Sequence, residues 1–125
     1  MQEYISLELS KKLIELGAPK EAEKWLENPN RNLEYYPAFS CRQLLEWLPY
    51  TISRDEIDFD FYIYKDERGY IVGYAEKEID GNTLDNQVMP FIEKDFLDAI
   101  AKMLIYLLEN GWKFEGNLIV KKEVL

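Results

Sequence analysis

The sequence predicts an α+β fold: one small domain over residues 1–125, with an antiparallel, hairpin-based sheet packed on one face by three to four helices. Two observations lead to this prediction. Apolar residues recur with helical spacing in several segments, whereas residues 56–78 alternate apolar and polar side chains, which is the period of a strand. A chain of 125 residues that is 47% hydrophobic is also long enough to bury one core.

Two helices are predicted before residue 28. Residues 6–16 carry an apolar stripe, and Gly17 follows as a residue suited to a helix C-terminus. Pro19 favours the first turn of a second, shorter helix over residues 19–27. We expect residues 28–38 to form a loop, since "NPN" stops that helix. The first stripe consists of Leu9, Leu13 and Leu16.

A further helix is predicted to begin at Cys41, within "YYPAFSCRQLLEWLP". Ser40 precedes Gln43 by three residues, which is the spacing of a capping box. The helix should end before Pro49, because the residue preceding a proline is pushed out of helical geometry.

The alternating segment 56–78 predicts a hairpin of two strands, with "DERG" as the turn. We expect Lys65 opposite Tyr70, Ile63 opposite Val72, Phe61 opposite Tyr74, and Asp58 opposite Lys77. One side of the first strand then carries Ile57, Phe59, Phe61 and Ile63, and the other side carries Asp58, Asp60, Tyr62 and Tyr64.

The C-terminal part predicts one long helix and a short apolar segment. After the polar connection "IDGNTLDNQ", residues 93–109 place leucine and isoleucine on one helix face and end at "NG". Residues 118–120 resemble a strand, so the segment 113–125 is expected either as a third strand or as a frayed tail.

Charge and composition restrict the partners that we expect. The net charge is −9, and residues 56–98 hold twelve acidic and four basic residues, which opposes binding to nucleic acid or to an anionic membrane. The apolar run "MLIYLL" is far shorter than the roughly 20 residues that cross a bilayer. One cysteine agrees with a reducing compartment, so we expect a cytoplasmic protein.

Cys41 is the residue with the clearest potential for chemistry. The first turn of a helix can lower the pKa of a thiol, which favours a nucleophile. The chain contains no histidine, however, and the usual base of a cysteine or serine nucleophile is therefore missing. Cys41 also shares a helix face with Leu44, Leu45 and Leu48, so we expect it to pack inward and predict no catalytic residue.

Two acidic segments are candidate metal sites. The first contains Asp55, Glu56, Asp58 and Asp60, and the second is "DGNTLDN" at residues 80–86. Neither has the spacing of a calcium loop, because the first continues into a strand and the second lacks the bidentate glutamate. We expect solvated acids in both places, with no metal and no cofactor.

Three segments resemble small proteins encoded by bacteriophages and prophages. They are "LSKKLIELG" at residues 9–17, the pattern from Pro37 to Pro49, and "DAIAKMLIYLLENG" at residues 98–111. The phage and prophage proteins that this chain resembles have no established activity. The resemblance therefore implies a mobile element in a bacterial host, and it assigns no role to any residue.

The expected function is that of a non-enzymatic phage or prophage accessory protein that binds a host or phage protein. Its candidate contact surface is the strand face of Asp58, Asp60, Tyr62 and Tyr64, because tyrosine offers contact area at low entropic cost. The same face is also what an ordinary solvated sheet surface would look like. The alternative function is an acidic mimic of nucleic acid that blocks a DNA-binding protein. The oligomeric state stays open.

Overall fold

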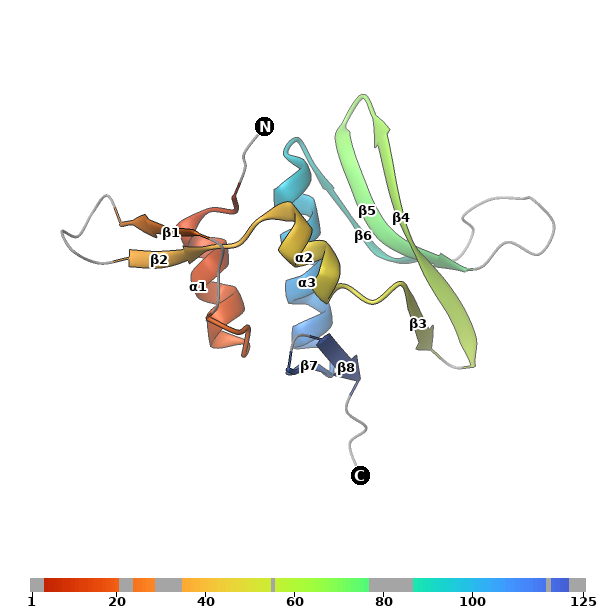
Figure 1. The fold of residues 1–125 in the computed structure, drawn as a ribbon. Coiled ribbons are helices and arrows are strands. Elements are labelled where there is room, and N and C mark those ends of the chain that lie inside the picture. The colour runs from red at the N-terminus through yellow and green to blue at the C-terminus, as the bar shows by residue number, and fades with distance from the viewer. Residues whose placement is uncertain are drawn as a thin grey trace.

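The computed structural model describes residues 4–20, 24–28, 35–54, 56–76, 87–116 and 118–121. Within these ranges the chain is a small single domain of the α+β class, as predicted, with three helices and eight strands in antiparallel sheets (Figure 1). The elements in chain order are α1 (Leu7–Glu15), β1 (Lys24–Glu27), β2 (Tyr35–Ala38), α2 (Cys41–Trp47), β3 (Thr51–Arg54), β4 (Ile57–Asp66), β5 (Gly69–Glu76), β6 (Gln87–Glu93), α3 (Phe96–Glu109), β7 (Trp112–Glu115) and β8 (Leu118–Lys121).

The principal sheet has four strands in the order β3-β4-β5-β6. The predicted hairpin is confirmed as β4 and β5, and its register is confirmed in the pairs Lys65–Tyr70, Ile63–Val72 and Phe61–Tyr74. The turn is tighter than "DERG", because Asp66 still pairs with Gly69. The expected opposition of Asp58 and Lys77 lies outside the described residues.

Helix α3 covers one face of this sheet and forms the centre of the core. It contacts β5 and β6, with Phe91 and Tyr106 ring centroids 6.0 Å apart and those of Tyr70 and Phe96 5.4 Å apart. The Lys102 ammonium also pairs with the Glu93 carboxylate of β6. We call this covered side the inner face of the sheet.

The prediction that three to four helices pack on one sheet face is not confirmed. Helix α1 contacts α3 and β2 and lies on the side of α3 away from the sheet (Figure 1). This stacking is possible because α3 is apolar around much of its circumference and can bury surface on two sides. Its buried residues are Leu97, Ala99, Ile100, Ala101, Met103, Leu104, Leu107 and Leu108.

The three helix starts follow from side-chain caps. Ser6 accepts a hydrogen bond from the backbone N–H of Leu9, and Ser40 accepts one from Gln43, so α2 begins at Cys41 as predicted. Asp95 caps α3 by accepting from Leu97 at 2.9 Å. Because Asp95 occupies the cap position, α3 begins at Phe96 rather than at residue 93.

The predicted helix over residues 19–27 is wrong, and so is the continuous loop over residues 28–38. Strands β1 and β2 pair there as a two-stranded ribbon, with Trp25 opposite Pro37. A nine-residue helix with one weak apolar side gains little stability by itself, and the pairing with a strand further along the chain overrides its local preference. That pairing is not visible in the local sequence pattern.

Strands β3 and β6 extend the hairpin on its two sides and are additions to the predicted fold. β3 is only four residues long. β6 contains Pro90, and the register between β5 and β6 shifts between Val72 and Tyr74. Short length, proline and a bulge each weaken the alternation from which a strand is recognised.

The C-terminal segment forms a strand over the part that the structure describes. β8 pairs with β7, so the strand at residues 118–120 is confirmed, but in a separate two-stranded ribbon rather than in the hairpin sheet. This ribbon packs on the core through Ile119, which is buried, and through Phe114, whose ring lies 5.1 Å from that of Trp47. None of the helices in the described ranges combines the length and apolar character that a membrane crossing requires.

Candidate interaction face

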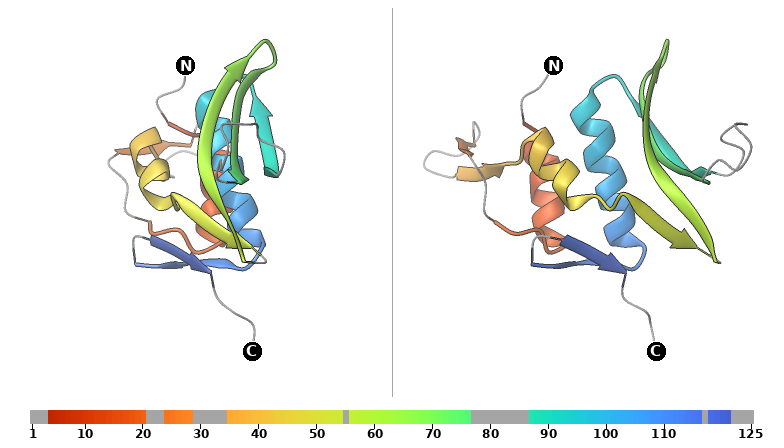
Figure 2. Two further views of the ribbon diagram at one scale, coloured as in Figure 1. Left: turned by 90° about the vertical axis from the view of Figure 1, so that its right-hand side faces the viewer. Right: turned by 45° about the vertical axis from the view of Figure 1, so that its right-hand side comes forward.

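The second face of the four-stranded sheet is directed away from α3, and we call it the outer face. Figure 2 shows β4, β5 and β6 in front of the helices when this face is turned to the viewer. Strand alternation and the observed register place the predicted residues there, because their neighbours along β4 face α3. The outer face comprises Thr51, Ser53, Asp58, Asp60, Tyr62, Tyr64, Asp66, Ile71, Gly73, Ala75 and Ile92.

One end of the outer face is acidic and is ordered by β3. The Thr51 hydroxyl donates a hydrogen bond of 2.8 Å to Asp60, and the Ser53 hydroxyl donates one of 2.5 Å to Asp58. Each bond engages one oxygen of its carboxylate and holds the side chain of the acid in place. Asp58 is exposed and Asp60 is half-buried. The pair presents two negative charges on adjacent outward positions.

The other end of the outer face is aromatic and apolar. Tyr64 is 54% exposed and pairs with Ile71, which is buried at 6% exposure. Ile92 of β6 lies on the other side of Ile71 and is 38% exposed. Ile71 thus forms a floor between two exposed side chains, which is the arrangement of a contact surface rather than of a purely polar sheet face.

Tyr62 lies across the sheet over Gly73, its partner on β5. A Cβ atom added at Gly73 would lie 2.8 Å from the Tyr62 hydroxyl oxygen and 2.9 Å from the ring carbon Cε1. Burial of the ring raises the pKa of the Tyr62 phenol. Gly73 therefore sets how far Tyr62 projects from the outer face.

We expect Gly73→Ala to lift Tyr62 away from β5, because the new methyl group would occupy the position of the ring. The free energy of unfolding should fall by about 1 kcal/mol or less, since the far end of a side chain can move aside. Equilibrium urea denaturation measures this cost, and spectrophotometric titration should show the Tyr62 pKa closer to its ordinary value. In a Tyr62→Ala background the cost of Gly73→Ala should vanish. An equal cost in both backgrounds would contradict the contact.

The turn between β4 and β5 places a salt bridge at the aromatic end. Arg68 donates to Asp66 at 2.6 Å, and this hydrogen bond holds the pKa of the Asp66 carboxyl below its ordinary value. Because Arg68 compensates Asp66, the acids of the β4 row that form no ion pair with another described residue are Asp58 and Asp60.

A hollow of about 470 Å³ lies between this turn and the start of α3. Its walls carry charges of both signs, so it gives no single-sign field for a charged substrate. The charged residues that line it are Lys65, Asp66, Glu67, Arg68, Lys94 and Asp95.

Cys41 lies in the first turn of α2, as predicted, and is half-buried against the core. Desolvation raises the pKa of its thiol, so the helix start does not activate it. Ser40 already accepts from the Gln43 N–H at this end. The geometry favours a packing role for Cys41.

We expect Cys41→Ala to lower the free energy of unfolding by about 1 kcal/mol, because a partly buried small side chain is lost. Partner binding should be unchanged. Urea denaturation measures the first effect. In the native protein at neutral pH, alkylation by iodoacetamide should be slower than in the unfolded chain. Alkylation of the native protein at the faster rate would contradict this assignment.

The two acidic segments do not converge on a metal site within the described residues. Asp55 and residues 80–86 lie outside them, and Glu56 is exposed in the turn before β4, where its φ is 65°. Among the described side chains, no group of three or more potential ligands lies together.

Several residues of the outer face were not predicted from the sequence. Thr51 and Ser53 matter because they hold the two acids, and Ile92 borders the aromatic end. The alternation in "TISR" is a weak signal for β3. No comparable local signal identifies Ile92, since its place depends on the pairing of β6 with β5.

No protein-family model matches this chain, and neither the curated proteins nor the solved structures contain a match to it.

Proposed function

We propose that the chain is a non-enzymatic binding protein that contacts another protein through the outer face of its four-stranded sheet. One observation carries the proposal: no helix of the described part covers this face, yet Tyr64 and Ile92 are exposed at one end of it and an ordered acidic pair lies at the other. Exposed aromatic and apolar side chains rimmed by charge are typical of protein interfaces.

The partner that fits this face has an apolar patch bordered by lysine or arginine. The apolar patch would cover Tyr64 and Ile92, and the basic residues would meet Asp58 and Asp60. Electrostatic complementarity of this kind raises the association rate and fixes the orientation of the partners. We place this function in the cytoplasm of a bacterial host, with a host or phage protein as partner, on the strength of the single cysteine and the resemblance to phage proteins.

The acidic mimic of nucleic acid rests on the same two aspartates and on the net charge of −9. The tyrosine end of the face favours the protein interface instead, because a mimic of phosphate groups has no use for exposed apolar area. The two functions differ in their response to salt. Binding through charge alone weakens steeply as salt is added, whereas an interface centred on Tyr64 does not.

We expect Tyr64→Ala to weaken partner binding about tenfold or more, because a central aromatic contact is removed. The tagged protein captures candidate partners from bacterial lysate, and each identified partner is purified and its Kd measured against both variants. The free energy of unfolding should change by about 1 kcal/mol or less, as expected for an exposed strand position.

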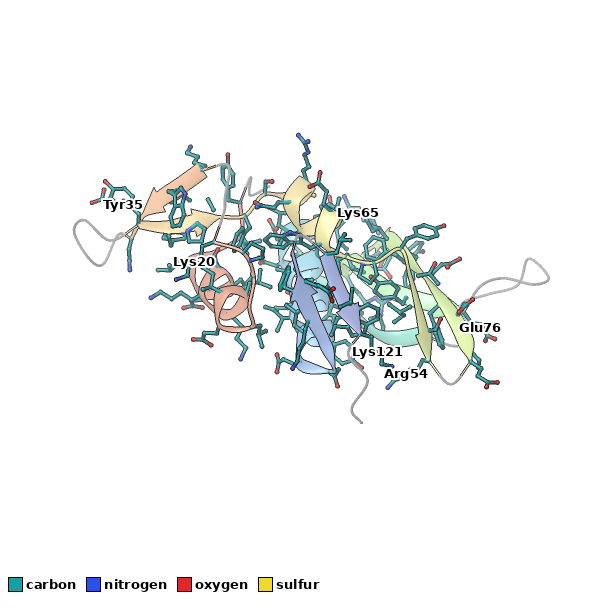
Figure 3. The ribbon with its side chains drawn as sticks, turned by 60° about the horizontal axis from the view of Figure 1, so that its bottom comes forward. Lys20, Tyr35, Arg54, Lys65, Glu76 and Lys121 are labelled. Carbon is teal, nitrogen blue, oxygen red and sulfur yellow. The ribbon has the colours of Figure 1, made fainter. Side chains whose placement is uncertain are left out.

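Tyr35→Ala is the matched control for this measurement. Tyr35 is 56% exposed, almost the same as Tyr64 at 54%, but it belongs to β2 at the opposite end of the molecule (Figure 3). Unchanged binding by Tyr64→Ala, or equal losses in both variants, would refute the outer face as the contact surface. Loss on Asp58→Asn with none on Tyr64→Ala, together with steep salt dependence, would favour the nucleic-acid mimic.

A further inference from the structure

The hairpin strand β4 is much longer than β3, its neighbour on the side away from β5. β3 pairs with Ile57 to Asp60, and the N–H of Phe61 donates to the Tyr50 carbonyl at 2.8 Å. Beyond Phe61, β4 continues to Asp66 with β5 on one side only. Figure 1 shows the β4–β5 hairpin projecting past β3. This part of β4 is therefore an edge of the sheet.

The direction of the backbone groups on this edge follows from the register. In an antiparallel hairpin with a two-residue turn, the residues that flank the turn form a hydrogen-bonded pair, and every second residue repeats it. Asp66, Tyr64 and Tyr62 thus direct their N–H and C=O groups toward β5. Ile63 and Lys65 direct theirs away from β5, in the same sense as Phe61, whose N–H reaches Tyr50.

No backbone group of the described residues pairs with the outward N–H and C=O groups of Ile63 and Lys65. Their side chains leave the edge accessible as well. The Lys65 ammonium lies 5.1 Å from the Tyr70 ring centre on β5, so it is turned away from the edge. Ile63 is 44% exposed and offers apolar surface beside the open backbone.

The opposite edge of the sheet is protected in the usual ways. β6 carries Pro90, which has no N–H, and its pairing with β5 is interrupted by a register shift. Proline and bulges prevent the addition of a further strand. The contrast between the two edges singles out β4 between Tyr62 and Asp66.

We propose that an extended peptide segment of a partner protein adds to the sheet as a fifth strand along Tyr62–Asp66 of β4. A row of strand-spaced backbone donors and acceptors is complementary to another extended backbone, which is the basis of recognition by strand addition. The proposal rests on the proposed function only in taking a protein as the partner. It uses the edge of the sheet, whereas the proposed function uses the outer face.

The charges on β4 favour a basic, partly apolar segment over a second copy of this chain. On the outer side the added strand would lie beside Tyr62 and Tyr64, and its end would approach Asp60, where the pairing with β3 begins. On the inner side it would lie beside Ile63 and Lys65, whose ammonium is turned toward Tyr70. Basic and apolar residues in alternation match these neighbours. A second copy would bring another net charge of −9 to the same edge, and the like charges would oppose association.

Native-state hydrogen exchange tests the free edge without any partner. We expect the amides of Tyr62 and Tyr64 to exchange about tenfold or more slowly than those of Ile63 and Lys65, because only the former donate to β5. Equal protection of Ile63 and Lys65 in the free protein would show that the edge is already covered, and it would overturn the proposal.

Panning a random octapeptide library against the protein tests strand addition itself. Enriched peptides should alternate basic and apolar residues and should slow exchange at Ile63 and Lys65. Ile63→Pro removes one outward N–H while it keeps the bonds to β5, so it should weaken binding about tenfold or more. Ile63→Ala is the matched control, because it shortens the same side chain but keeps the outward N–H, so it should weaken binding by less than Ile63→Pro.

N-methylation of alternate amides in an enriched peptide gives a second test that is independent of how Ile63→Pro folds. Methylation on the side that faces β4 should abolish binding. A library without enriched peptides would overturn strand addition. So would methylated peptides that bind as tightly as the unmethylated ones, or peptides that bind the Ile63→Pro variant as tightly as wild type. If Ile63→Pro weakens partner binding and Tyr64→Ala does not, the proposal of strand addition stands and the outer face is refuted. If Tyr64→Ala weakens partner binding and Ile63→Pro does not, the outer face stands and strand addition is refuted.

Discussion

Tyr74→Ala is expected to lower the free energy of unfolding by about 4 kcal/mol, because it removes a fully buried aromatic side chain from the inner face. Tyr74 is 0% exposed and its ring centre lies 5.4 Å from that of Phe61. Its hydroxyl also donates to the Pro49 carbonyl at 2.5 Å, which ties β5 to the end of α2. Domains of this size are stable by about 5–15 kcal/mol, so urea denaturation should show a large loss of stability or an unfolded chain.

Tyr74→Phe is the control that separates the ring from the hydroxyl. It keeps the packing and leaves the Pro49 carbonyl without its donor, which should cost about 1–2 kcal/mol. Burial raises the pKa of Tyr74 in the folded protein, so its hydroxyl stays protonated there at pH values that ionise it in the unfolded chain.

The alkaline profile follows from the sign of this pKa shift. The contribution of the protonated hydroxyl is complete below about pH 10, where an unfolded tyrosine titrates, and it is lost as the pH rises from there toward the folded-state pKa. Wild type should therefore lose stability above that pH more steeply than Tyr74→Phe. Parallel profiles for the two proteins would contradict the burial of this hydroxyl.

The parts of the fold that were predicted correctly have local causes. Ser40 and Gln43 specify the start of α2 within four residues of each other. The β4–β5 register follows from alternation and a nearby turn, so Phe61 and Tyr74 meet without help from the rest of the chain. Such patterns can be recognised in a single sequence because the interacting residues lie close together along the chain.

The parts that were missed depend on contacts between distant segments. β1 is a strand because residues 35–38 pair with it, and its own sequence weakly favours a helix. The layering of α1 behind α3 depends on the apolar circumference of α3, which becomes visible only when both of its sides are found covered. A periodicity argument assigns each element a buried face, but it does not say which neighbour covers that face.

The candidate site likewise has a part that was predicted from the sequence and a part that was missed. Alternation predicted that Asp58, Asp60, Tyr62 and Tyr64 share one side of a strand. It did not distinguish Tyr62, which is half-buried over Gly73, from Tyr64, which is exposed, because the difference arises on β5. The open edge at Ile63 and Lys65 was also out of reach, since it depends on where β3 ends.

Gly69→Ala is expected to lower the free energy of unfolding by about 3 kcal/mol or more, because it combines backbone strain with an overlap of main-chain atoms. Gly69 begins β5 with a φ of 131°, a conformation that residues with a Cβ rarely adopt. An added Cβ would also overlap the Glu93 carbonyl oxygen and lie 2.9 Å from its carbonyl carbon. Side chains can move aside, but here the obstacle is the backbone of β6, so the strands must separate.

Gly17→Ala isolates the strain from the overlap. Gly17 follows α1 with a φ of 101°, and nothing lies within 4 Å of the position that its Cβ would take. It should therefore cost only the left-handed strain of about 1–2 kcal/mol. The additional loss in Gly69→Ala, measured by urea denaturation of both variants, is the cost of forcing β5 and β6 apart.

Amide exchange should locate that cost in the sheet. The N–H groups of Tyr70 and Val72 point toward β6, so these two amides should lose protection in Gly69→Ala and not in Gly17→Ala. Equal losses in the two variants would show that β6 does not pack against Gly69, and this end of the sheet would then need a different pairing.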